Sequence, residues 1–132
     1  MSDHHLDLAR TLWGEARGEG RAGMEAVANV VMNRVNDRRR WANNVTGVVR
    51  QPWQFSAWNA NDRNRPQMLR VTTSDPQFRI ATEIAREAIA GRLPDRTRGA
   101  NHFYAFRLIR SPVWANPRAV TVVIGGHRFL RL

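Results

Sequence analysis

The chain has 132 residues, of which 42% are hydrophobic and 24% charged, a composition that fits one globular domain over residues 1–132 and excludes a disordered or fibrous protein. It has no cysteine, which excludes disulfides, thiolate metal sites and a cysteine nucleophile. All 21 basic residues are arginine and the formal net charge is +10, so an anionic partner is expected: nucleic acid, acidic lipid or a bacterial cell wall. Because codon bias also produces arginine-rich chains, charge alone does not choose among these partners.

The first ten residues, MSDHHLDLAR, carry acids and histidines where a secretory signal needs basic residues followed by an apolar stretch. No run approaches the roughly 20 apolar residues of a membrane span. We therefore expect a protein that is made in the cytoplasm without a signal peptide and does not insert into a membrane. A monomer is expected.

The first predicted element is an amphipathic helix with apolar residues at Leu6, Ala9, Trp13 and Ala16, capped by Ser2 or Asp3. The segment GEARGEG, residues 14–20, contains three glycines, and glycine at this density predicts that the helix ends there. A second helix is expected over residues 23–35, with valines at positions 27, 30, 31 and 35 forming its buried stripe.

In the middle of the chain we expect a short helical turn over residues 44–49 and a short strand over residues 54–59, where apolar and polar residues alternate. Residues 61–73 are polar and are predicted to form a long surface loop or a weak hairpin. Asp75 is the predicted N-cap of a four-turn helix that begins at Pro76 and ends before Gly91.

Past Gly99 the chain becomes richer in aromatic and β-branched residues. An aromatic cluster over residues 103–106 is followed by the β-rich residues 119–124 and a glycine pair, Gly125-Gly126, at a predicted turn. The expected fold class is α+β, mainly helical.

Glu15 and Glu19 are the only acids between Asp7 and Glu25, and glycines flank them on both sides. A glutamate at a helix end, against Trp13, is partly desolvated, which raises its pKa and favours general-acid chemistry. The alternative is that both glutamates form ordinary helix-end ion pairs with nearby arginines (Arg10, Arg17 and Arg21). The local pattern favours this alternative, and the rest of the chain reverses the preference.

Five segments carry a resemblance that runs in order from Leu8 to Phe129: LARTLWGEARGEG, VMNRV ending at Val35, VVRQPWQFSAWN from Val48, GANHFY from Gly99 and IGGHRF from Ile124. Together they resemble the cell wall hydrolase family that includes the catalytic domains of spore cortex-lytic enzymes. The family pattern often has Tyr in place of Trp13 and Phe103, and Thr in place of Asn101. These departures leave the first glutamate of the motif unchanged.

The resemblance implies a lysozyme-like fold, with a small β element beside the cleft, that cleaves the β-1,4 bond between N-acetylmuramic acid and N-acetylglucosamine in peptidoglycan. It assigns the general acid to Glu15. Most glycosidases need a second carboxylate, for which Glu19 is the candidate, with Asp62 and Asp75 more remote. A single acid suffices if the C6 hydroxyl of the muramyl sugar attacks its own anomeric carbon, and we rank this lytic transglycosylase route slightly above hydrolysis as a muramidase.

Six further residues are predicted to contact the glycan. Gln54 would bind an acetamido group. Phe55 would pack beneath Gln54, although a core role is favoured for Phe55. The aromatic rings of Trp58 and Tyr104 would stack on sugar rings. His102 is expected to form part of the cleft wall and to offer hydrogen bonds there. The predicted substrate-binding residues are Gln54, Phe55, Trp58, Asn101, His102 and Tyr104.

No metal or other cofactor is expected, because His102 and His127 lack the convergent partners and the HExxH spacing of a zinc site. Two alternative functions are an arginine-rich nucleic-acid-binding module and a non-catalytic wall-binding domain. A nucleic-acid-binding module gives no reason for the segment GEARGEG, so we expect no specific nucleic acid as partner. The small basic chain is typical of a phage or prophage endolysin, which would reach the wall after holin-type release or virion delivery.

Overall fold

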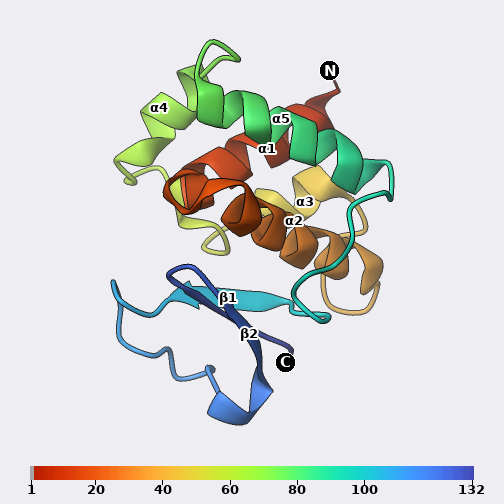
Figure 1. Ribbon diagram of the computed structural model, residues 1–132, viewed down its shortest axis with the longest axis vertical. Helices are drawn as coiled ribbons and strands as arrows, with labels where there is room; N and C mark the ends of the chain where they lie inside the picture. Colours follow the sequence, from red (N-terminus) through yellow and green to blue (C-terminus); the bar gives the residue numbers. More distant parts are fainter. Residues whose placement is uncertain (1) are drawn as a thin grey trace.

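The computed structural model describes residues 2–132 and places the helices and a three-stranded sheet at opposite ends of the molecule (Figure 1). The helices are α1 (Asp3–Ala16), α2 (Gly20–Asn36), α3 (Val45–Val49), α4 (Asn64–Arg70) and α5 (Pro76–Ile89). The strands are β1 (His102–Ala105), β2 (Val120–Ile124) and β3 (His127–Leu130), and short 3₁₀ turns are η1 (Arg17–Glu19), η2 (Ser56–Trp58) and η3 (Pro117–Ala119). The mainly helical α+β class is confirmed.

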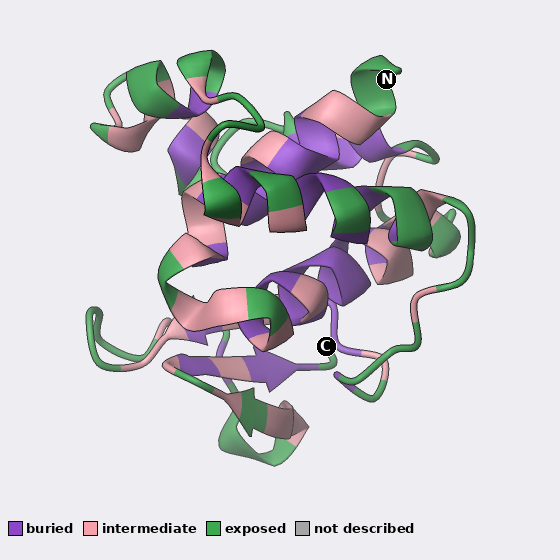
Figure 2. Ribbon diagram, turned by 45° about the horizontal axis from the view of Figure 1, so that its top comes forward, coloured by how far each residue is buried: buried purple, intermediate pink, exposed green. Residues whose placement is uncertain are grey.

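Helix α1 is the central element of the helical part and packs against α2, α3, α4 and α5. Of its predicted apolar stripe, Ala9, Trp13 and Ala16 are buried and Leu6 is half-buried. Its N-cap is Ser2, whose hydroxyl accepts a hydrogen bond from the His5 amide. The buried faces of the helices turn inward, while exposed residues cover the outer surface and the loops (Figure 2). Helix α5 follows the prediction closely, with Asp75 accepting from the Phe78 amide at 3.0 Å and Gly91 at φ +75° just past its end.

The glycine-rich segment does end the first helix. The helical backbone continues through Gly14 to Ala16, turns through η1 and restarts at Gly20, three residues earlier than predicted. Gly14 stays inside the helix because a Cβ there would lie 2.7 Å from the Cβ of Ala57. This close approach fixes residues 56–57 against the end of α1.

The sheet is antiparallel with strand order β1-β3-β2. Strands β2 and β3 form the hairpin predicted around Gly125-Gly126, with Ile124 opposite His127, and Gly125 has φ +57°. Phe129 on β3 is fully buried against Ala26 and Val30 of α2, so this helix joins the sheet to the helical part.

Two predictions for the middle of the chain are wrong. Residues 54–59 form turns and η2 in place of a strand: the Trp58 amide donates to the Phe55 carbonyl, and no strand lies alongside. Residues 61–73 contain α4, whose only fully buried residue is Met68, so an apolar stripe was not visible in the sequence. No helix in residues 2–132 combines the length and apolar character needed to cross a membrane.

Candidate active site

A cleft of about 800 Å³ separates the end of α1 from the sheet. Residues from the helical part and its loops that line it include Gly14, Glu15, Gly18, Glu19, Arg34, Trp53, Gln54, Ser56 and Asn64. Residues from the sheet part include His102, Phe103, Tyr104, Ala105, Arg107, Leu108, Ile109, Trp114, Gly126 and His127. All five sequence segments that carried the resemblance therefore contribute residues to the cleft, and VMNRV contributes Arg34.

Glu15 lies in the last turn of α1 and faces this cleft. Its pKa is raised from 4.5 to about 7, mainly by burial and in addition by the negative charge of Asp62, while hydrogen bonds from the Ala57 and Ser56 amides and the Ser56 hydroxyl oppose the rise. The carboxyl is therefore protonated in a large fraction of molecules at neutral pH. It is able to donate a proton to a bound ligand and to take one back.

The surroundings of Glu15 differ from the prediction in one respect. Trp13 was expected to desolvate it, but Trp13 is buried in the core and its indole N–H donates to Asp75 at 3.3 Å. Ser56 and Ala57, the latter held against Gly14, contact the carboxyl instead and hydrogen-bond to it. The alternative of helix-end ion pairs is wrong for residues 2–132: Arg17 bonds to Asn64, and Arg21 pairs with Glu83 (2.7 Å).

Glu19 lines the same cleft, and its Oε2 accepts a hydrogen bond from the Gly126 amide at 3.0 Å. A Cβ on Gly125 would lie 2.1 Å from the same oxygen, so both glycines are needed for the contact. This bond ties the α1–α2 turn to the β2–β3 hairpin. Of the remote candidates, Asp62 accepts from the Asn64 amide at 2.8 Å without lining the cleft, and Asp75 caps α5.

Arg34 is a cleft residue that the sequence analysis did not single out. It lies on α2 one helical turn beyond Val30 and Val31, on the buried face, and is itself buried. Its guanidinium donates to the Asn101 carbonyl at 2.8 Å and to Gln54 Oε1 at 3.3 Å. An arginine in an apolar helical stripe was the signal that could have revealed it. Burial, with a contribution from Arg40, lowers its pKa to about 10.

The contact with Arg34 fixes the orientation of the Gln54 side chain. A guanidinium has donors only, so the amide oxygen of Gln54 must face it. The amide NH₂ is then left to donate into the cleft, where a carbonyl oxygen would be the matching ligand group. This geometry fits the predicted role of Gln54 toward an acetamido group, which stays a prediction.

His102 lines the cleft as expected, and its Nδ1 bonds to the side-chain oxygen of Asn101 at 2.8 Å. Burial, together with the positive charges of Arg34 and Arg40, lowers its pKa to about 4, so the ring is neutral at pH 7. Asn101 does not line this cleft, because its amide is occupied by the backbone of Leu132. Asn101 acts on the cleft through its hydrogen bond to His102, which orients the imidazole ring.

Among the predicted stacking residues, Tyr104 lines the cleft but is buried, and Arg128 donates to its hydroxyl at 3.1 Å. Phe55 is fully buried in the core and does not line the cleft, in agreement with the favoured core role. His127, which was considered only as a metal ligand, is buried at the cleft wall, and its Nδ1 has no hydrogen-bond partner in residues 2–132. Burial lowers the pKa of His127, and the negative charge of Glu19 offsets only part of this decrease.

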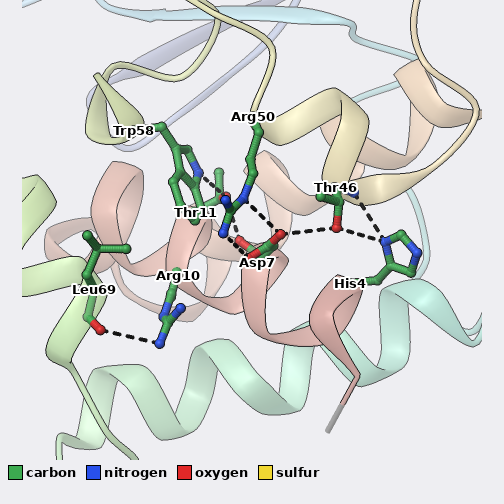
Figure 3. A network of polar contacts seen from close by, with 8 residues as sticks. All are labelled: His4, Asp7, Arg10, Thr11, Thr46, Arg50, Trp58 and Leu69. Carbon is green, nitrogen blue, oxygen red and sulfur yellow. Dashed lines mark hydrogen bonds and ion pairs between the residues drawn. The ribbon is translucent and has the colours of Figure 1, made fainter. Parts of the chain in front are cut away.

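Trp58 lies outside the cleft, in a polar network on α1 (Figure 3). Its indole N–H donates to Thr11 at 2.8 Å, and the Arg50 guanidinium lies 4.5 Å above its ring. Arg50 in turn forms a two-pronged ion pair with the buried carboxylate of Asp7, which also accepts from Thr46. The structure therefore gives Trp58 a bracing role between α1 and α3.

The sequence matches known proteins over most of its length. A family model described as Cell Wall Hydrolase matches residues 18–130, a range that starts just after Glu15. Spore cortex-lytic enzymes of Halalkalibacterium halodurans and Bacillus subtilis are 32% and 31% identical over 97% and 92% of the chain. The chain spans only 35% of the length of each of these relatives.

Two solved structures share the fold. The catalytic domain of the germination-specific lytic transglycosylase SleB from Bacillus anthracis aligns with a TM-score of 0.72 and 27% identity, covering 99% of this chain and 97% of that one. The catalytic domain of Bacillus cereus SleB aligns with a TM-score of 0.73 and 29% identity, covering 98% and 91%. These matches confirm the resemblance seen in the sequence and its lysozyme-like fold.

Proposed function

The chain belongs to the cell wall hydrolase family, and on this premise we propose that it is a peptidoglycan lytic transglycosylase with Glu15 as its general acid and base. The bond cleaved is the β-1,4 linkage between N-acetylmuramic acid and N-acetylglucosamine. The observation that carries the proposal is a carboxyl with a pKa of about 7 facing a cleft large enough for several sugar rings. The similarity to SleB of Bacillus anthracis, itself a germination-specific lytic transglycosylase, supports the same reaction class.

The proposed reaction uses one carboxyl group twice, first as an acid and then as a base. Protonated Glu15 donates to the glycosidic oxygen as the bond from this oxygen to C1 of the muramyl sugar breaks. The resulting carboxylate then takes the proton of the C6 hydroxyl as O6 bonds to C1. The product is a 1,6-anhydro sugar, no water is consumed, and Glu15 returns to its protonated form.

The carboxylates around the cleft favour this route over hydrolysis. Glu15 and Glu19 are the only acids that line it in residues 2–132, and one oxygen of Glu19 is engaged by the Gly126 amide. Asp62 does not line the cleft, and its charge adds to burial in raising the pKa of Glu15. A second carboxylate acting on the sugar would have to be Glu19, which remains the alternative for a muramidase mechanism.

The other cleft residues supply binding and orientation in this proposal. The NH₂ of Gln54 donates to an acetamido carbonyl, while Arg34 holds the amide in place. Neutral His102 offers a hydrogen bond to a sugar hydroxyl without adding a positive charge near the proton donor.

Mass spectrometry of the fragments released from purified cell walls tests the proposal. Anhydro-muropeptides are expected with the wild-type protein and none with Glu15→Gln. Reducing-end products would replace the transglycosylase route by hydrolysis. Binding to walls without release, retained in Glu15→Gln, would indicate a wall-binding domain, and salt-sensitive DNA binding without release would indicate a nucleic-acid-binding module.

Delivery to the wall as a phage endolysin, through a holin or with a virion, stays a prediction. It is tested separately by expressing the chain with and without a co-expressed holin and measuring lysis from within. Lysis that depends on the holin is the expected result.

A further inference from the structure

Exposed apolar side chains gather at the cleft. Eight large hydrophobic residues are well exposed in the described chain, and four of them line this single cleft: Trp53, Leu108, Ile109 and Trp114. Trp53 comes from the loop before η2, whereas the other three come from the connection between β1 and β2. Exposed apolar surface concentrated in a cleft indicates a binding surface for an apolar face of a ligand.

Trp53 is the most unusual of the four. Its side chain is 78% exposed, and no aromatic or cation-π contact in residues 2–132 involves its ring. Trp114, by comparison, is 40% exposed and packs at 5.0 Å from the ring of His102. The free protein therefore gains little packing from the Trp53 side chain.

The backbone of Trp53 is also in an unfavourable conformation. Its φ is +69°, in the left-handed region that glycine adopts most readily and that bulky residues rarely occupy. Arg98, at φ +58°, is the only other non-glycine residue with positive φ in the described chain. A large apolar side chain that is strained and unpacked in the free protein is expected to gain its contacts in a complex.

The position of Trp53 is well defined by its neighbour. The Gln54 amide donates to the Gln51 carbonyl at 3.2 Å, and the Gln54 side chain is held by the buried Arg34. An exposed indole face and an amide donor thus occur on consecutive residues at one side of the cleft. An N-acetylated pyranose presents the matching pair of groups: an apolar ring face and an acetamido carbonyl.

We propose that Trp53 is a stacking platform for an N-acetylated sugar ring of the glycan strand, and that the Gln54 amide binds the acetamido group of the same strand. This inference rests on the proposed function and adds to it a residue that determines affinity for the polymer. Its contribution is uniform binding, so it lowers KM and leaves the chemical step unchanged.

The test uses Trp53→Gly, Trp53→Phe and, as a matched control, Arg98→Gly. Each glycine variant replaces a side chain at a positive φ. Arg98, however, is exposed and does not line the cleft that contains Trp53. It also does not line a second, smaller depression, which includes Arg38, Arg39 and Arg131. Binding is measured by calorimetry in a Glu15→Gln background at 0.15 M salt or above. The ligand is soluble glycan strands, prepared by removing the stem peptides from purified walls with an amidase.

Trp53→Gly should raise the Kd for these strands ~10-fold, as expected for the loss of one stacked ring. Trp53→Phe and Arg98→Gly should stay within about threefold of the parent, and neither glycine variant should lower the Tm. In the active protein, Trp53→Gly should raise KM for the strands by a similar factor and leave kcat within about twofold. Strand binding should shift the indole emission to shorter wavelength, and Trp53→Phe should remove most of that shift.

An unchanged Kd and KM in Trp53→Gly would overturn the inference, and so would a loss confined to kcat. Failure of the proposed function gives a different pattern: wild-type protein that releases no muropeptides, whatever residue 53 is. A Trp53→Gly variant with a lower Tm and a lower affinity would assign the side chain a structural role and contradict the platform.

Discussion

Replacing Glu15 with glutamine should stabilise the protein at alkaline pH while it lowers the rate of cleavage by orders of magnitude. The amide keeps the shape of the side chain and still accepts hydrogen bonds from the Ser56 and Ala57 amides. Because it carries no charge, it avoids the cost of holding a carboxylate in a partly dry site beside Asp62. Activity and stability therefore change in opposite directions at this residue.

The magnitude follows from the change in proton affinity on folding. The pKa of Glu15 is raised from 4.5 to about 7, so the folded state binds more protons than the unfolded state between these values. The free energy of unfolding contributed by Glu15 is fully present below pH 4.5 and falls as pH rises to about 7. At about 1.4 kcal/mol for each tenfold change in affinity, the loss reaches about 3 kcal/mol above pH 7. For a chain of this size that is a Tm difference of about 10 °C.

Thermal unfolding of the wild type and Glu15→Gln between pH 4 and pH 9 measures this effect directly, because all other titrating groups are shared. The two Tm curves should meet at acid pH and separate as the pH rises to 7. Wall-clearing activity should fall by ~10²–10⁴ in the variant. Parallel Tm curves would refute the raised pKa, and equal, modest losses of activity in Glu15→Gln and Glu19→Gln would refute the assignment of roles.

Three further outcomes are expected. Activity should decline as pH rises through about 7, since Glu15 must be protonated. Asp62→Asn removes a charge that raises the pKa of Glu15, so it should move this decline in kcat/KM to lower pH. An unmoved profile would contradict the influence of Asp62. Asp75→Ala removes the N-cap of α5 and should cost about 1 kcal/mol in urea unfolding, whereas no change in midpoint would mean the cap is dispensable. Gly125→Ala places a methyl group against Glu19 at positive φ and should cost ~1–3 kcal/mol; an unchanged Tm would show that this contact is not needed.

The elements that could be predicted are those whose signals are local. The ends of α5 are set by Asp75, Pro76 and Gly91, and each acts within its own turn of backbone. The strand predicted at residues 54–59 failed because no partner strand lies beside it: Phe55 is buried with its ring near that of Phe103, and Ala57 is buried against Gly14 of α1. Burial of alternate residues looks the same in a sequence whichever element supplies the cover.

The candidate site was predictable only in part, for the same reason. Glu15 stands out by its glycine-rich setting, but its pKa depends on Ser56, Ala57 and Asp62, which only the folded chain brings near. Arg34 reaches the cleft because α2 carries it beneath Gln54, a contact between residues 20 positions apart. Trp58, a predicted aromatic platform, lies outside the cleft with its indole N–H donating to Thr11, a contact that the sequence does not reveal.

The hydrogen bond between Glu19 and Gly126 joins residues 107 positions apart. One wall of the cleft is thus supplied by the last thirty or so residues of the described chain, and the proton donor sits near its start. During synthesis a ribosome releases the donor long before the hairpin that completes the groove. In the proposed enzyme, the groove is therefore expected to be incomplete until the β2–β3 hairpin docks against the α1–α2 turn, and removing that hairpin should prevent binding of a glycan strand.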